Sequence, residues 1–346
     1  MINSKSYLKD LERQIGRINL SDFKDKKVLV TGAAGLICSY IVDMFILANK
    51  KYDANITIMA LSRTEESLKS RFGYYFDNEL FIPVIQDVCS PCEVDVDYII
   101  HGASNANPKL YIEDPVGTMN ANYLGTLNLL ELAKRSNAKM VFISSGDVYG
   151  SFENPDVLLE ENEYGYVDIL NIRSSYASSK RASETLCASF ASQYGVMAKI
   201  VRPAHIYGPT FTKGDTRAVS DFMGKATKGE NIIMKSDGSS LRSYCYVGDT
   251  VVGILKVLVD GEVGNAYNIT NTNGLVSIRE LAETICKYAG VELVIELPSN
   301  ELDKKINQNV KVIKLSSKKL EDLGWEVLTS VDEGVELTLK VISEIK

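Results

Sequence analysis

The first 208 residues alternate short apolar runs with segments of helical periodicity, and this alternation constrains the fold more than any other feature. The runs are rich in valine and isoleucine and nearly continuous in apolar character, which is typical of parallel strands buried on both faces of a sheet. They lie at 27–32, 56–61, 80–86, 97–103, 140–145 and 198–208. Helical periodicity occupies the segments between them, at 35–49, 64–72, 115–136 and 175–195. The alternation predicts an α/β fold with a doubly wound parallel sheet.

After about residue 208 the regular alternation ends, and Gly, Ser and Thr become more frequent. Helical patterns return at 249–259, 277–289, 315–323 and 331–345. We therefore predict a second, smaller lobe of mixed structure, packed at the carboxyl edge of the sheet. The first 25 residues are predicted to form a helical extension, whose role the sequence does not reveal.

Composition excludes several classes of function. A formal net charge of -7 argues against a nucleic-acid-binding surface, which would need clustered Lys and Arg. No run of 18 apolar residues occurs, so no membrane span is predicted. The polar N-terminal segment lacks the apolar centre of a signal peptide, and we expect a cytoplasmic protein with its six cysteines as thiols. Only two histidines and a single CxxC at 89–92 are present, so no metal site is predicted.

The stretch "VLVTGAAGLICSY" (28–40) follows the first predicted strand and opens a helix. Gly32 and Gly35 allow a tight turn and the close approach of backbone amides to a pyrophosphate at a helix N-terminus. The third glycine of such fingerprints is replaced by Cys38, which is small enough for helix–strand packing to survive. In its strand–turn–helix context, the motif predicts a dinucleotide site in a Rossmann-type sheet.

The end of the second predicted strand bears on which dinucleotide is bound. NAD sites usually present Asp or Glu there, whereas this chain has Ser62 followed by Arg63. The missing carboxylate beside an arginine permits a 2′-phosphate, so NADP stays possible beside NAD. Asp87, at the end of the third strand, could accept a hydrogen bond from the adenine amino group or could cap a loop.

Tyr176 and Lys180 in "SSYASSK" (174–180) stand four residues apart at the start of a predicted helix. Residues at i and i+4 lie on one helix face, so the phenol and the ammonium are held side by side. The pair is either an ordinary surface pair or a phenol whose proton the lysine helps to remove. A neighbouring ammonium favours the phenolate anion, and a general base acts best with a pKa near the working pH.

Four motifs stand in order along the chain, namely "TGAAGLI", "YASSK", "RPAHIYGP" and "LRSYCYVGDT". With them the chain resembles the extended short-chain dehydrogenase/reductases, and more narrowly their nucleotide-sugar epimerase, dehydratase and decarboxylase branch. The stretch "NIRSSYASSKRASETLC" (171–187) is most similar to UDP-glucuronate decarboxylases. The resemblance implies an enzyme that oxidises a nucleotide sugar at C4 with bound NAD(P)+ and then acts on the 4-keto intermediate. It also implies a homodimer, paired through the helices at 115–136 and 175–195.

The same resemblance assigns roles to domains and residues. Beside the helical extension that the pattern predicts at 1–25, it implies an NAD(P)-binding domain at 26–208 and a mainly nucleotide-sugar-binding lobe at 209–346, with interleaved boundaries. Tyr176 would be the base, Lys180 would lower the pKa of the tyrosine and hold the nicotinamide ribose, and Ser145 would bind the same sugar oxygen. Cofactor contacts are expected from Gly32, Gly35, Leu36, Ile37, Ser62, Arg63, Asp87, Val88, Ala103, Asn122, Tyr176, Lys180 and Pro203. Substrate contacts are expected from Ser104, His205, Arg217 and Arg242.

Three of the substrate-contact positions have alternative interpretations. Arg217 and Arg242 look like clamps for the diphosphate, because a guanidinium binds phosphate through two hydrogen bonds, but each could be surface charge. His205 replaces the Asn of the family's "RP-x-N-x-YGP" stretch, and it could donate to the diphosphate or be a packed core histidine.

The reaction after C4 oxidation depends on "SSGDVYG" (144–150). The 4,6-dehydratases have Thr-Asp-Glu where this chain has Ser145, Gly146 and Asp147. Gly146 removes the usual acid, whereas Asp147 keeps a carboxylate in the position of the base for C5. A decarboxylase needs less, since a C6 carboxylate beside a C4 ketone is a β-keto acid. The residues leave decarboxylation, 4,6-dehydration, 4-epimerisation and ketoreduction open. A non-catalytic binding protein is the remaining alternative, although such relatives commonly lose the tyrosine or the lysine.

Overall fold

The computed structural model describes residues 1–153, 157–212, 214–297 and 314–345. Its largest element is a seven-stranded sheet in which all neighbours are parallel. The strand order is β11-β7-β5-β4-β1-β2-β3. The strands are β1 (Lys27–Thr31), β2 (Thr57–Ser62), β3 (Phe81–Ile85), β4 (Tyr98–His101), β5 (Lys139–Ile143), β7 (Ala198–Pro203) and β11 (Ala266–Ile269). The predicted α/β fold with a parallel Rossmann-type sheet is confirmed.

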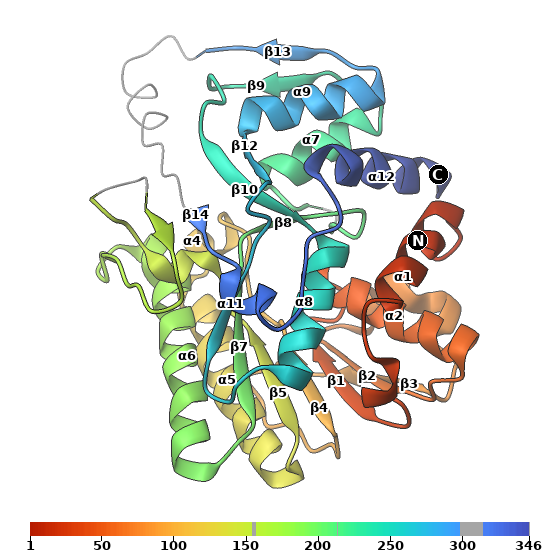
Figure 1. Cartoon of the computed structure of the whole chain (residues 1–346), viewed down its shortest axis with the longest axis vertical. Coiled ribbons are helices and arrows are strands. Elements are labelled where there is room, and N and C mark those ends of the chain that lie inside the picture. Colours follow the sequence, from red (N-terminus) through yellow and green to blue (C-terminus); the bar gives the residue numbers. More distant parts are fainter. Residues whose placement is uncertain (154–156, 213, 298–313, 346) are drawn as a thin grey trace.

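Helices cover both faces of this sheet (Figure 1). Successive residues of β1 illustrate why, because Val28 and Val30 join one buried cluster while Leu29 joins the other. The first cluster includes apolar side chains of α2 (Leu36–Tyr52), α3 (Glu65–Phe72) and α8 (Val247–Asp260). The second includes side chains of α5 (Pro115–Ser136) and α6 (Ser175–Tyr194), which pack against each other.

A smaller lobe lies beyond the carboxyl ends of the central strands, at the top of Figure 1. Its three-stranded sheet is mixed, since β10 (Leu241–Tyr246) pairs parallel with β8 (His205–Tyr207) and antiparallel with β12 (Leu275–Ser277). Two further strand pairs are β9 (Ile232–Met234) with β13 (Leu293–Ile295) and β6 (Leu158–Leu159) with β14 (Lys314–Leu315). The helices of this lobe are α7 (Ala218–Ala226), α9 (Ile278–Ala289) and α12 (Val331–Glu344), whereas α11 (Lys318–Glu321) packs against β11 of the central sheet.

The short elements complete the path of the chain. α4 (Leu110–Glu113) precedes α5, and the described ranges also contain the 3-10 turns η1 (Leu20–Asp22), η2 (Gly73–Tyr75), η3 (Gly146–Tyr149) and η4 (Ile172–Ser174). Across the ranges that the structure describes, no helix is both long and apolar enough to span a bilayer.

Two predicted elements are corrected by the structure. The strand expected at 198–208 divides at Ala204, whose N–H donates to the carbonyl of Ile269 in β11. Residues before that point belong to the central sheet and those after it to the small lobe. The helix expected at 315–323 begins as the strand β14 and shortens to α11, because Lys314 and Leu315 pair with β6.

The N-terminal helix α1 (Lys5–Ile15) is docked rather than projecting from the molecule. Its buried Asp10 accepts hydrogen bonds at 2.6 Å from the hydroxyls of Tyr40 in α2 and Tyr246 at the end of β10. Near its start, Ser4 donates to Glu344 of α12 at 2.7 Å, so the two ends of the chain lie together (Figure 1). α1 therefore connects the central domain to the small lobe.

Candidate active site

The turn between β1 and α2 has the shape that a dinucleotide site needs. Gly32 has a φ of 66°, and a Cβ at this position would lie 2.9 Å from the backbone N of Ala103. Gly35 is the N-cap of α2 and provides no side-chain cap. The first amides of α2, including those of Leu36 and Ile37, therefore form an uncapped positive helix end that suits a pyrophosphate. These residues fit an NAD pyrophosphate.

The structure shows how Cys38 replaces the third glycine of the motif. A side chain on Gly102, directly after β4, would clash with Cys38 Sγ. The sulfur thus occupies space that glycine at 102 leaves open, and α2 keeps its close packing on the sheet. Burial raises the pKa of the Cys38 thiol to about 12, so we expect it to stay protonated.

The carboxyl ends of β2 and β3 hold the residues predicted at the adenosine end. Ser62 ends β2 and bonds Ser67 at 2.6 Å between hydroxyl oxygens, while Arg63 is exposed. Asp87 accepts from the backbone N–H of Cys89 at 2.8 Å, and this bond is the main cause of its lowered pKa. The nearby Arg63 guanidinium lowers the same pKa further, so Arg63 and Asp87 are neighbours.

A hydrogen-bonded chain runs from β1 to the helix that carries Tyr176. Thr31 Oγ1 accepts from the Ala103 N–H at 3.2 Å and lies 2.8 Å from Nδ1 of the buried His101. The other ring nitrogen lies 3.2 Å from Oγ1 of Thr126 in α5. Asn122, one turn earlier in α5, donates from Nδ2 to Ser179 of α6 at 2.9 Å.

Within the described part of the chain, two predicted contact residues have a buried side-chain oxygen that lacks a hydrogen-bond partner. They are Ser104, at its hydroxyl, and Asn122, at Oδ1. Buried polar atoms normally have partners, so both atoms are suited to receive a ligand. Of the other predicted cofactor contacts, Val88 is buried against Gly125 of α5, and Pro203 ends β7.

Tyr176 lies in the first turn of α6 and is 7% exposed. Its ring stacks on Tyr111 of the α4 region, with centroids 5.3 Å apart and 18° between the planes. Burial raises the pKa of Tyr176 above its ordinary value, and the negative charge of Asp147 raises it further. A hydrogen bond with Ser145 acts in the opposite direction. The structure thus brings Tyr176, Ser145 and Asp147 together.

Lys180 lies one turn further along α6 and is fully enclosed by protein. Its Nζ donates to the carbonyl of Ile143, at the end of β5, at 2.7 Å and lies 5.7 Å from the ring centre of Tyr176. Burial lowers its pKa to about 7, and the nearby Glu184 offsets only part of that effect. The predicted lowering of the tyrosine pKa by Lys180 stays a prediction, because the ammonium here bonds a carbonyl rather than the phenol.

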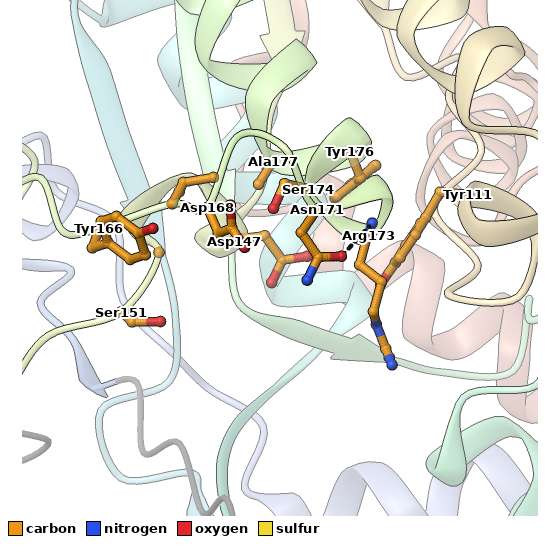
Figure 2. A pocket seen from close by; sticks show the side chains of 12 residues that line it. Tyr111, Asp147, Ser151, Tyr166, Asp168, Asn171, Arg173, Ser174, Tyr176 and Ala177 are labelled. Atoms are coloured by element: carbon orange, nitrogen blue, oxygen red, sulfur yellow. Dashed lines mark hydrogen bonds between the residues drawn. The ribbon is translucent and has the colours of Figure 1, made fainter.

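The phenol opens into a pocket of about 430 Å³ (Figure 2). Predicted residues on its wall are Tyr176 and Asp147, the latter on η3, where its N–H donates to Ser145 Oγ at 3.1 Å. The remaining lining residues are Tyr111, Gly150, Ser151, Tyr166, Val167, Asp168, Asn171, Arg173, Ser174 and Ala177.

The predicted diphosphate contacts lie on the side of the small lobe and not on the wall of this pocket. His205 begins β8, and its pKa is lowered to about 4 by desolvation and by the charges of Arg242 and Arg217. These three residues are therefore close enough to interact. Arg217 is not a free cation, because its guanidinium binds the Asp215 carboxylate through Nε and Nη2.

Comparison with known proteins identifies the family of this chain. Residues 28–270 match the NAD dependent epimerase/dehydratase family. The chain belongs to that family. It is 34% identical to UDP-glucuronic acid decarboxylase 6 of Arabidopsis thaliana, over 90% of this chain and 87% of that protein. It is 30% identical to UDP-glucuronic acid decarboxylase 1 of Xenopus tropicalis, over 92% of this chain and 73% of that protein.

Solved structures show the same fold in this epimerase/dehydratase family. UDP-glucose 4-epimerase of Thermotoga maritima, solved with UDP-glucose, has a TM-score of 0.74 at 24% identity and covers 92% of this chain and 99% of its own. dTDP-glucose 4,6-dehydratase of Bacillus anthracis, solved with NAD, has a TM-score of 0.75 at 21% identity and covers 91% of this chain and 96% of its own. The predictions of an enzyme and of NAD as its cofactor are confirmed by the family.

Sequence reasoning missed most of the pocket lining, and Tyr111 and Arg173 are the two missed residues that bear most on its chemistry. Tyr111 reaches the site only because α4 folds its segment against the start of α6. No periodicity marks so short a helix. The sequence gives a weak indication of Arg173 as a site residue, since it is a charged residue three positions before the predicted catalytic tyrosine.

Proposed function

We propose that this chain is an NAD-dependent decarboxylase whose substrate is a UDP-linked uronic acid. Membership in the NAD dependent epimerase/dehydratase family supports the class of chemistry, and the identity to UDP-glucuronic acid decarboxylases over most of both chains supports the substrate. The observation that carries the proposal is the pocket in which Asp147 lies beside the Tyr176 phenol, with no second acid at position 146.

Tyr176 is the base that removes the proton from the C4 hydroxyl, and Ser145 holds the same oxygen by its hydroxyl. NAD, held by the turn around Gly32 and Gly35, would supply the hydride acceptor for the oxidation of C4 and the hydride donor for its reduction. Once C4 is a ketone, the C6 carboxylate leaves as carbon dioxide, and its bonding electron pair remains on C5 as an enolate. C5 then takes up one proton, which comes from solvent, and the Asp147 carboxylate is placed to relay it by first accepting that proton and then donating it to C5. Tyr176 finally returns its proton to the C4 oxygen.

Position 146 argues against dehydration as the net reaction. Loss of the C6 hydroxyl as water needs an acid that protonates the leaving oxygen, and the related dehydratases carry it where this chain has Gly146. A Cβ at this position would lie 3.3 Å from Leu315 Cδ1 and 3.7 Å from the carbonyl oxygen of Pro203. A side chain here would have to displace the Leu315 methyl slightly, and with glycine in place Asp147 is the single carboxylate of η3.

Product masses test the proposal directly. The NAD-loaded enzyme is incubated separately with UDP-glucuronate, UDP-glucose, UDP-N-acetylglucosamine and dTDP-glucose. We expect loss of carbon dioxide from UDP-glucuronate and no net change in the others. Loss of water from a hexose would indicate a dehydratase instead, and interconversion of hexose epimers without a mass change would indicate a 4-epimerase. Either outcome, without decarboxylation, contradicts the proposal.

Tyr176→Phe provides the matched variant for the catalytic role. It keeps the ring that stacks on Tyr111 and removes only the hydroxyl, so the fold and bound NAD should be retained. Turnover should fall by about 10²–10⁴-fold, the usual contribution of a general base. Turnover near the wild-type rate would contradict the assignment of the base.

A homodimer is part of the same proposal. Val116, Met119 and Tyr123 form one apolar stripe on α5, and their exposed fractions are 67%, 45% and 40%. This stripe lies on the helix that packs beside α6, and pairing of both helices with a second copy would cover it. A cytoplasmic location stays a prediction, which fractionation of the native cells would test.

A further inference from the structure

The pocket wall contains one arginine that the proposed function has not used. We propose that Arg173 is a specificity-determining residue that binds the C6 carboxylate of the sugar. This inference rests on the proposed function, because it concerns the end of the sugar that a decarboxylase acts on. Arg173 belongs to η4, which leads directly into α6, so it is tied to the helix that carries the catalytic tyrosine.

The backbone of Arg173 is fixed while its guanidinium is free. Asn171 caps η4 by accepting from the N–H of Arg173 at 3.0 Å. Among the residues that the structure describes, the guanidinium has neither a hydrogen-bond partner nor an ion-pair partner. Other arginines near the site differ, since Arg217 binds Asp215, and Arg202 binds Glu184 at 2.7 Å. Arg173 is therefore available to an anionic ligand.

The position of the charge agrees with the place of the sugar. Burial and the charge of Asp147 raise the pKa of Tyr111, and the charge of Arg173 opposes that rise, so Tyr111 lies near both charged groups. Tyr111 is also the ring that stacks on Tyr176. Figure 2 shows Tyr111 and Arg173 together at one end of the pocket and Asp147 further along it. A sugar whose C4 hydroxyl reaches the phenol must lie within this group of side chains.

The charge balance of the pocket makes a cation necessary for a uronate. Asp147 would repel a carboxylate that enters the same pocket, and this repulsion grows as water is displaced. A guanidinium offsets it and can bind both carboxylate oxygens at once. A neutral hexose gains nothing comparable from Arg173. The residue should thus favour uronates over hexoses.

Binding measurements on two matched ligands test the inference. UDP-glucuronate and UDP-glucose are titrated calorimetrically into NAD-loaded protein that carries Tyr176→Phe, so that turnover does not interfere. Arg173→Gln should weaken UDP-glucuronate by about 10–100-fold, the range for a lost charged hydrogen bond, and UDP-glucose by less than about threefold. Arg173→Lys, which keeps the charge but not the paired donors, should give an intermediate loss.

Arg279→Gln is the control, because it removes the same charge from an exposed arginine of α9. It should leave both affinities unchanged. Equal weakening of both ligands by Arg173→Gln, or no weakening of either, would overturn the role in specificity. If instead the Tyr176→Phe protein with Arg173 intact has no preference for UDP-glucuronate, and the wild type releases no carbon dioxide from it, the proposed function itself is contradicted.

In steady state the substitution should also separate two kinetic effects. A group that binds the carboxylate equally before and during the reaction should raise KM for UDP-glucuronate more than it lowers kcat. A purely structural effect of Arg173→Gln on η4 would disturb Tyr176 and lower kcat for every substrate. The latter result would also contradict the inference.

Discussion

Lys180 carries a charge that its surroundings oppose. The ammonium is enclosed among Ile143, Phe142 and Tyr176, and its Nζ lies 4.5 Å from the ring centre of Phe142. Its pKa falls from 10.5 to about 7 in the folded chain. In the unfolded chain the lysine stays charged up to its ordinary pKa. The folded state therefore bears a destabilising cost that is complete below about pH 7 and decreases as the pH rises from there towards 10.5.

Lys180→Met should accordingly stabilise the protein freed of bound nucleotide, and more at pH 6 than at pH 9. Because pH 9 lies two units above the Lys180 pKa of about 7, the gain in the free energy of unfolding should differ by at most about 3 kcal/mol between the two pH values. Thermal unfolding at both pH values measures it, with the exposed Lys228→Met as the control. A stabilisation that is equal at the two pH values, or larger at pH 9, would contradict the shifted pKa.

At the residue level, the sequence reveals the parts of the site that depend on local spacing. Tyr176 and Lys180 follow from a separation of four on one helix, and Gly32 and Gly35 follow from a turn between a strand and a helix. Tyr111 and Arg173 could not be assigned in the same way. Tyr111 lies 65 positions before the tyrosine that it stacks on, so only the folded chain brings the two rings together.

Among the elements, α1 has the clearest energetic role. Asp10 accepts hydrogen bonds from two tyrosine hydroxyls in different parts of the fold, and Arg13 and Gln14 of its own helix also donate to it. Asp10 is only 4% exposed, so water could not accept these hydrogen bonds if the carboxylate were removed. α1 thus contributes a buried acceptor that the rest of the fold is built to satisfy.

Asp10→Ala should therefore lower the free energy of unfolding by about 3–5 kcal/mol, because it leaves several buried donors without an acceptor. Tyr40→Phe is the matched control, since it removes one of the two hydroxyls and keeps the carboxylate; we expect a loss of about 1 kcal/mol. Urea denaturation curves of both variants provide the comparison. Similar small losses in the two variants would mean that α1 contributes little.

Element length explains which strands could be predicted. The six strands expected before residue 208 are apolar runs, and each has a counterpart in the structure, although the edge strand β3 is only partly buried. β9, β12 and β13 have only three residues each, too few for alternation to be recognised, and β11 has four. β11 pairs with β7 across more than 60 intervening residues, a contact that no local pattern indicates.

At the scale of the whole molecule, the apolar stripe of α5 leads to a prediction about assembly. Val116→Glu combined with Met119→Glu places two charges in the proposed dimer contact, and burial of unpaired charge is costly. We expect the wild type to elute as a dimer and the variant as a folded monomer in size-exclusion chromatography with light scattering. The same change at Val263 and Ile233, which are exposed outside α5 and α6, should leave the dimer intact. A monomeric wild type would contradict the proposal.

The return of β11 to the central sheet has a consequence for motion. The chain leaves the large sheet at Ala204, comes back through α8 directly after β10, and leaves again between β11 and β12. The small lobe is thus joined to the large domain by several covalent connections and, through α1 and α12, by contacts at both termini. A hinge motion of a lobe needs one flexible connection, with no other links to the rest of the molecule. Here any rigid swing of the lobe would have to bend all of these connections at the same time.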